Sequence, residues 1–154
     1  VILMYLHAKL KQKRKQAGIK GWVRTQDLDG RGTQIYRDPK TGITSRPDVV
    51  LNDRVIEHKS AEVKDKARRG DVLQLLAEMI SAKKDIGELR YPNKKNFEFR
   101  INSPKMRSLR GELANINGQM ERHLRTHSAP KGRPTRNRCR NCDYRRECSE
   151  SMAA

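Results

Sequence analysis

The pattern of apolar and polar positions predicts a β-hairpin in the first half of the chain. Two short β-branched runs occupy residues 47–51 and 54–59, and the pair Asn52-Asp53 separates them. Both residues of this pair tolerate positive φ, which suits a two-residue hairpin turn. The runs are therefore expected to pair as antiparallel strands.

Two longer stretches have apolar residues at helical spacing. Residues 71–83 carry an apolar stripe at positions i, i+3, i+4, i+7 and i+8, and Asp71 can cap the start. Residues 104–127 keep a spacing of three to four, and Ser103-Pro104 is typical of a helix start. The stripe residues are Val72, Leu75, Leu76, Met79 and Ile80 in the first helix and Met106, Leu109, Leu113, Ile116, Met120 and Leu124 in the second.

The remaining segments predict one more helix and three more strands. Residues 3–17 favour a helix, which Gly18 and Gly21 would end. Residues 22–38 have an irregular pattern, apart from a strand predicted at residues 34–37. Further strands are predicted at residues 88–91 and 96–101. This order of helices and strands indicates an α/β fold with a short mixed sheet.

The charge of the chain indicates what kind of partner it binds. The 154 residues include 35 Lys or Arg and 18 Asp or Glu, a net charge of +17. The excess is concentrated at the ends, since residues 9–24 carry seven Lys or Arg and no acid, and residues 104–148 carry twelve against four acids. A solvated surface is the ordinary interpretation of such runs. An excess of this size instead favours a polyanionic partner, with nucleic acid first and an anionic membrane surface second.

The first six residues leave two interpretations open. Residues 1–6 are apolar and run directly into a basic stretch. They suit either the end of a membrane anchor that begins before Val1 or the first turns of an amphipathic helix. No segment reaches the roughly 18 apolar residues that a membrane span needs.

The predicted hairpin would bring together residues that suit phosphodiester chemistry. Alternation along a strand places Glu57 and Lys59 on one face, and the turn brings Asp48 close to them. Two carboxylates can hold Mg²⁺, and an ammonium group can orient a water molecule or a phosphate. The alternative is an ordinary hairpin with charged residues on its solvent-exposed face.

Three cysteines lie close together near the C terminus, at Cys139, Cys142 and Cys148. Their odd number and tight spacing favour a metal or cluster site in a reducing compartment over a disulfide framework. Three thiolates do not complete a tetrahedral zinc site, so a fourth ligand would come from His123, His127 or a residue before position 1. Free thiols in a basic tail are the alternative.

Taken in order, these motifs resemble the RecB-like PD-(D/E)xK nucleases, the family of the fourth CRISPR-associated protein and of the Dna2 nuclease domain. The resemblance runs from about residue 20 to residue 149. It implies a restriction-endonuclease-like core. The matching motifs are Pro47-Asp48, Glu57-His58-Lys59-Ser60, Gln74-Leu75 and the run from Cys139 to Cys148.

This resemblance implies a metal-dependent DNA nuclease, an exonuclease acting on single-stranded ends, in the cytoplasm or tethered to the inner face of the membrane. It also implies CRISPR-adaptation or DNA-repair proteins as partners. Lys59 would position the attacking water, and Gln74 would contact DNA or orient Lys59. The implied ligands of Mg²⁺ or Mn²⁺ are Asp48, Glu57, the backbone carbonyl of His58 and His7, and those of a 4Fe–4S cluster are Cys139, Cys142 and Cys148.

Two features depart from the family pattern. Glu78 stands where the Gln-x-x-x-Tyr motif of the family has its Tyr. No cysteine precedes Cys139 to supply the fourth thiolate of a cluster. Zn²⁺ with a histidine ligand is therefore the alternative to iron–sulfur.

Three segments are expected from these observations. They are a basic N-terminal helix at residues 1–20, a PD-(D/E)xK nuclease core at residues 21–129 with a mixed sheet flanked by helices, and a Cys-rich metal or iron–sulfur tail at residues 130–154. A non-catalytic nucleic-acid-binding module with a zinc-binding tail is the main alternative. A membrane-surface protein held by its basic N-terminal helix is the other.

Overall fold

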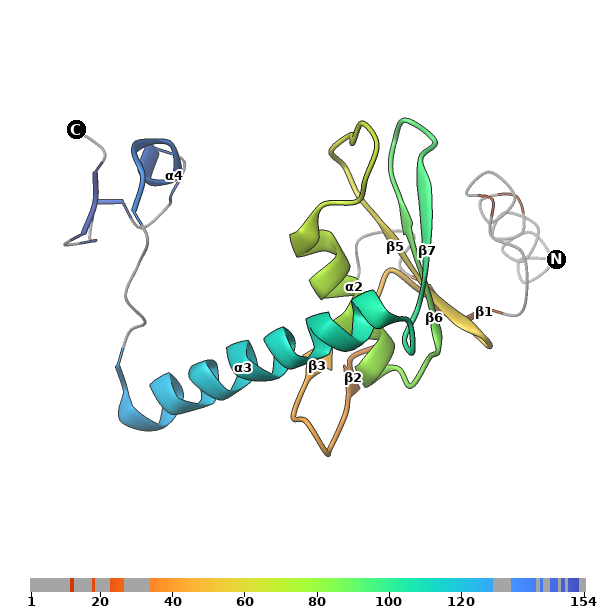
Figure 1. The fold of residues 1–154 in the computed structure, drawn as a ribbon, viewed down its shortest axis with the longest axis horizontal. Helices are drawn as coiled ribbons and strands as arrows, with labels where there is room; N and C mark the ends of the chain where they lie inside the picture. Colours follow the sequence, from red (N-terminus) through yellow and green to blue (C-terminus); the bar gives the residue numbers. More distant parts are fainter. Residues whose placement is uncertain are drawn as a thin grey trace, which may run out of the picture. The chain divides into compact units, whose positions relative to one another are not determined.

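The structure is a computed structural model, and Figure 1 shows its fold. It divides into two compact units, residues 1–115 and 116–154. The expected helix at residues 3–17 lies outside the described residues except for Gln12, as does His7. The structure describes residues 34–128 and 134–140 without a break, together with Gln12, Gly18, Val23–Gln26, Cys142, Arg145, Arg146, Cys148, Glu150, Ser151 and Met152.

A five-stranded mixed sheet forms the centre of the first unit. Strands β5 and β6 pair in parallel, and the other neighbouring pairs are antiparallel. Helix α2 (Arg69–Ser81) connects the two parallel strands, as a parallel pair requires. This mixed α/β sheet confirms the predicted fold class at that level. The strands lie in the order β1 (Val23–Gln26), β4 (Val49–Leu51), β5 (Arg54–His58), β6 (Ile86–Arg90) and β7 (Asn96–Arg100).

The predicted hairpin is formed by β4 and β5. Val49 pairs with Ile56 and Val50 with Val55, which leaves Asn52-Asp53 as the turn. Neither Asn52 nor Asp53 has a positive φ, so the expected left-handed turn geometry is wrong. Lys84 Nζ donates a hydrogen bond of 2.7 Å to the Asn52 carbonyl, and this bond holds the turn from the loop after α2.

Helix α2 packs its apolar stripe on one face of the sheet (Figure 1). Gly87 in β6 permits this close approach, because a Cβ there would lie 2.6 Å from Met79 Sδ and 2.9 Å from the Leu75 side chain. The first turns of α3 (Pro104–Thr126) complete the core. The buried residues of this core include Val50, Val55, Val72, Leu75, Leu76, Met79, Leu89, Met106 and Leu109.

Two short strands differ from the sequence-based expectation. β1 falls in a segment predicted to be irregular, and β3 (Thr44–Ser45) lies where no strand was predicted, whereas β2 (Tyr36–Arg37) lies within a predicted strand. β1 has a single apolar side chain, Val23, so its strand conformation depends on pairing with β4. The N-cap position of α2 is Arg68 and not Asp71.

The start of α3 agrees with the predicted signal, because the Met106 backbone N–H donates to Ser103 Oγ at 3.4 Å. The second unit contains the last turns of α3 and the short helix α4 (Arg136–Arg140). Of the helices that the structure describes, none combines the length and the apolar character needed to cross a membrane.

Candidate active site

Three of the predicted site residues lie at the end of the β4–β5 hairpin opposite its turn. Asp48 directly precedes β4, and continuation of the register places it opposite Glu57. Asp48 Oδ2 accepts a 2.7 Å hydrogen bond from the His58 backbone N–H, which holds the carboxylate against β5. Lys59 follows β5, and its backbone N–H donates to the Arg90 carbonyl at 2.8 Å. The hairpin and the parallel β5–β6 pair therefore fix the backbone of this group.

Gln74 of α2 joins the same group through its side chain. Lys59 Nζ donates to Gln74 Oε1 at 2.7 Å and to Glu57 Oε1 at 3.1 Å. Gln74 Nε2 donates to Glu57 Oε1 at 2.6 Å. The structure therefore brings Gln74 to Glu57 and Lys59, although it is distant from them in the sequence.

Glu57 is buried without full compensation of its charge. Its side chain is only 7% exposed, and burial raises the pKa of its carboxyl group. The negative charge of Asp48 raises this pKa further, whereas Lys59 lowers it. Among the described residues, Glu57 Oε2 has no hydrogen-bond partner. A buried carboxylate oxygen without a donor is unfavourable, and a bound cation would compensate it.

Glu78 is a member of this group that the sequence analysis noted only as a departure from a motif. It lies one turn after Gln74 on α2, and Gln74 Nε2 donates to Glu78 Oε1 at 2.9 Å. Burial and the charge of Glu57 raise the pKa of Glu78 to about 8. Its Oε2 also has no partner in the described part of the chain. The available signal was a carboxylate placed directly before Met79 in the apolar stripe.

Asp71 and Tyr91 extend the network, and the sequence analysis assigned neither to the site. Asp71 Oδ1 lies 3.7 Å from Lys59 Nζ, and Asp71 Oδ2 accepts a 2.6 Å hydrogen bond from the Tyr91 hydroxyl. Burial, helped by the bond to Asp71, raises the pKa of Tyr91 to about 12. Asp71 therefore faces Lys59 and Tyr91 and does not act as the predicted helix cap.

The oxygen atoms at this site fit a hard divalent cation. The carboxylates of Asp48 and Glu57 and the backbone carbonyl of His58 are the kind of ligand that Mg²⁺ and Mn²⁺ prefer. Across the residues that the structure describes, no three His, Cys, Asp or Glu side chains form a metal-binding group. The ligands from the protein would therefore be two carboxylates and one backbone oxygen, and Mg²⁺ usually keeps several waters in such sites.

The described residues of the cysteine segment show no comparable arrangement. Cys139 on α4 is buried, Cys142 is half-buried and Cys148 is exposed, and all three are free thiols. They do not come together as a metal-binding group in the parts of the chain described here. Iron–sulfur or zinc binding by this segment stays a prediction.

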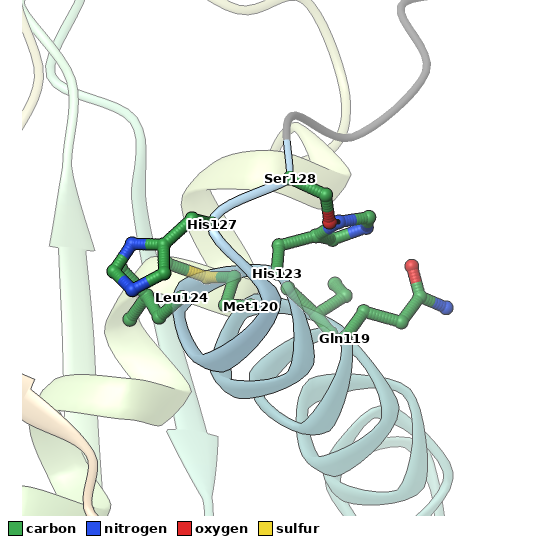
Figure 2. Close-up of a pocket in the computed structure, with 7 residues that line it drawn as sticks. Gln119, Met120, His123, Leu124, His127 and Ser128 are labelled. Carbon is green, nitrogen blue, oxygen red and sulfur yellow. Dashed lines mark hydrogen bonds between the residues drawn. The ribbon is translucent and has the colours of Figure 1, made fainter.

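The two histidines predicted as a fourth ligand lie near the end of α3. His123 Nδ1 is 2.9 Å from Ser128 Oγ. Figure 2 shows the rings of His123 and His127 on different sides of this helix end. Both line an open hollow of about 470 Å³ with exposed apolar side chains, among them Met120 and Leu124.

Comparisons with known proteins address the fold. No protein-family model matches the chain, and no curated protein matches it in sequence. The crystal structure of SSO0001 is similar, with a TM-score of 0.51 and 18% identity over 96% of this chain and 69% of that one. An alkaline exonuclease (LHK-Exo) from Laribacter hongkongensis aligns with a TM-score of 0.40 and 12% identity over 82% of this chain and 73% of that one. At these identities, the likeness to SSO0001 concerns the fold alone.

Proposed function

We propose that this chain is a metal-dependent nuclease that hydrolyses phosphodiester bonds in DNA, with a PD-(D/E)xK-type site. The observation that carries the proposal is the meeting of Asp48, Glu57 and Lys59 at one end of a hairpin, where Glu57 Oε2 is buried without a partner among the described residues. The net charge of +17 supports a polyanionic substrate.

Each residue of the site has a role that follows from its contacts. Asp48 and Glu57 would hold Mg²⁺ or Mn²⁺, with the backbone carbonyl of His58. Such a cation polarises a phosphoryl oxygen and lowers the pKa of a coordinated water. Lys59 would orient the attacking water and stabilise the charge that develops on the phosphate. Its hydrogen bonds to Glu57 and Gln74 hold the ammonium group in place, so little rearrangement is needed.

The finer form of the proposal is exonucleolytic hydrolysis of single-stranded ends. It rests on the resemblance to the RecB-like nucleases. The exposed basic residues at the start of α3, which are Lys105, Arg107 and Arg110, would contact the DNA backbone without reading its sequence. This form of the proposal predicts that a free DNA end is required.

Cleavage assays test both forms. Labelled linear and circular DNA, each single- and double-stranded, would be incubated with the purified protein in EDTA, Mg²⁺ or Mn²⁺. We expect metal-dependent cleavage of linear single strands, while circles stay intact. Binding of DNA by the wild-type protein without any cleavage would instead favour the non-catalytic binding module.

Site variants assign the activity to this group. Asp48→Ala, Glu57→Ala and Lys59→Ala should each abolish cleavage and leave DNA binding nearly unchanged, because the exposed basic residues are elsewhere. Glu98→Gln is the matched control, since Glu98 lies in β7 and pairs with Arg54. Full cleavage by the Glu57→Ala protein would refute the proposal.

A further inference from the structure

Glu78 occupies a place on α2 where packing favours an apolar side chain. It is 2% exposed, and its neighbours Leu75 and Met79 are fully buried. A buried carboxylate destabilises a core relative to an apolar side chain of similar volume. A specific contact of the carboxyl group, and not packing, therefore explains a glutamate at this place.

That contact is with the Gln74 carboxamide. Gln74 Nε2 donates to Glu57 Oε1 at 2.6 Å and to Glu78 Oε1 at 2.9 Å, and Gln74 Oε1 accepts from Lys59 Nζ at 2.7 Å. Both N–H groups of the amide therefore face carboxylates, and its oxygen faces the ammonium group.

The chemistry of these three contacts fixes the direction of the amide. If the carboxamide turned over, its oxygen would face two carboxylates and its NH₂ group would face the Lys59 ammonium. The bond to Lys59 would be lost because an ammonium group only donates, and the bonds to Glu57 and Glu78 in their ionised forms would be lost because a carboxylate only accepts. Glu78 supplies one of the two acceptors that enforce this orientation.

We infer that Glu78 is a positioning residue of this site: it holds the Gln74 carboxamide, and Gln74 in turn holds Lys59 and Glu57. The catalytic consequence of this inference rests on the proposed nuclease function. Glu78 acts through Gln74 and does not touch the substrate. Its loss should therefore lower kcat and leave KM nearly unchanged.

Two substitutions separate the contact from packing. Glu78→Gln keeps an oxygen that can accept from Gln74 Nε2, whereas Glu78→Met fills similar space without an acceptor. We expect Glu78→Gln to retain most of kcat, and Glu78→Met to lose about 10- to 100-fold, as small displacements of catalytic groups do. Urea unfolding should show the Met variant at least as stable as wild type. A Met variant with wild-type kcat would overturn the inference.

A double substitution tests whether the effect passes through Gln74. In a Gln74→Met background, adding Glu78→Met should change kcat little further, because the group that Glu78 orients is already absent. Independent, multiplicative losses from the two substitutions would contradict the proposed route.

A readout without catalysis keeps this inference separate from the proposed function. The ε-amine of Lys59 can be labelled with an amine-selective reagent and quantified by peptide mass spectrometry. Labelling should be faster in Glu78→Met and Gln74→Met than in wild type and Glu78→Gln. Equal labelling in all four proteins would refute the positioning role even in an active nuclease. If the wild-type protein does not cleave DNA, the proposed function fails and labelling alone decides this inference.

Discussion

The two faces of the five-stranded sheet differ in how their carboxylates are paired. Side chains alternate between the faces, so Glu57 lies on the face that packs against α2 (the α2 face). Glu88 and Glu98 lie on the opposite face (the far face), where they are directly paired across β6 and β7. On the far face, Arg90 binds Glu88 through two hydrogen bonds of 2.9 and 3.2 Å, and Arg54 Nη1 donates to Glu98 Oε2 at 3.0 Å.

On the α2 face, the carboxylates do not each have a guanidinium partner of their own. Glu57 shares the single ammonium group of Lys59 with Gln74, and Glu57 and Glu78 each keep one oxygen without a partner among the described residues. Arginine–carboxylate pairs such as those on the far face are structural interactions. Buried carboxylates with raised pKa values and incomplete pairing are typical of functional sites. The difference therefore favours the α2 face as the place of the proposed function.

Neutralising one carboxylate on each face gives the largest expected contrast. Glu57→Gln should reduce metal-dependent DNA cleavage by more than about 100-fold. Changing a residue that only hydrogen-bonds to a metal ligand typically lowers activity by about 10- to 100-fold, and loss of a ligand should exceed that range. Glu98→Gln should leave cleavage close to wild type, because it removes only a half-exposed ion pair. The measurement is kcat/KM on the same labelled DNA. Equal losses in both variants would show that the faces do not differ in function.

The site residues in the hairpin could be predicted from sequence because their spacing is local. Two β-branched runs around a two-residue turn determine which residues face each other, so Asp48, Glu57 and Lys59 follow from strand alternation. The order of elements indicated a short mixed sheet, and four of its five strands, β4 to β7, overlap predicted strands. The strand predicted at residues 34–37 instead pairs with β3 in a separate two-stranded sheet, and β1 was not predicted. Its sequence, Val-Arg-Thr-Gln, has too little apolar character to predict a strand without its partner β4.

The rest of the site depends on tertiary contacts that no local pattern encodes. Glu78 lies beside the apolar stripe of α2, and its closeness to Glu57 depends on how α2 lies across β5. Asp71 was assigned to a helix cap, which is the usual role of an acid at that place, but Tyr91 from the end of β6 binds it instead. A sequence can show that such a residue is unusual, but not which residue it contacts.

The second expected effect is a pH dependence of the free energy of unfolding, and it arises from Glu78 on the α2 face. The pKa of Glu78 rises from 4.5 to about 8 on folding, so the folded protein binds more protons than the unfolded protein between these values. The free energy of unfolding should therefore fall as pH rises through this window. The contribution is complete below about pH 4.5 and is lost above about pH 8.

Urea unfolding of the metal-free protein in EDTA checks this sign. The stability of wild type relative to Glu78→Gln should fall between these two pH values, because the amide cannot titrate. Parallel stability curves for the two proteins would show that Glu78 is not the titrating group.

Close packing on the α2 face gives a third expected effect. Gly87→Ala would place a Cβ 2.6 Å from Met79 Sδ and should destabilise the protein by about 1–3 kcal/mol, the usual range for overpacking. Gly111→Ala is the matched control, since no atom lies within 4 Å of its added Cβ and alanine favours the helix by about 0.5–1 kcal/mol. Urea unfolding should therefore show opposite signs for the two variants. A stabilised Gly87→Ala protein would mean that α2 lies farther from β6.

The smallest expected effect is on the far face. Arg54→Met removes the guanidinium that binds Glu98 at 3.0 Å and lies 4.0 Å from Glu88. The Arg54 side chain is 27% exposed and that of Glu98 45%, so the pair is screened and should contribute at most about 1 kcal/mol to the free energy of unfolding. The difference from wild type should shrink further in high salt, because ions screen exposed charges. DNA cleavage should be unchanged. A loss of cleavage with intact stability would contradict the division of roles, because it would connect the arginine pairs of the far face to the carboxylates of the α2 face.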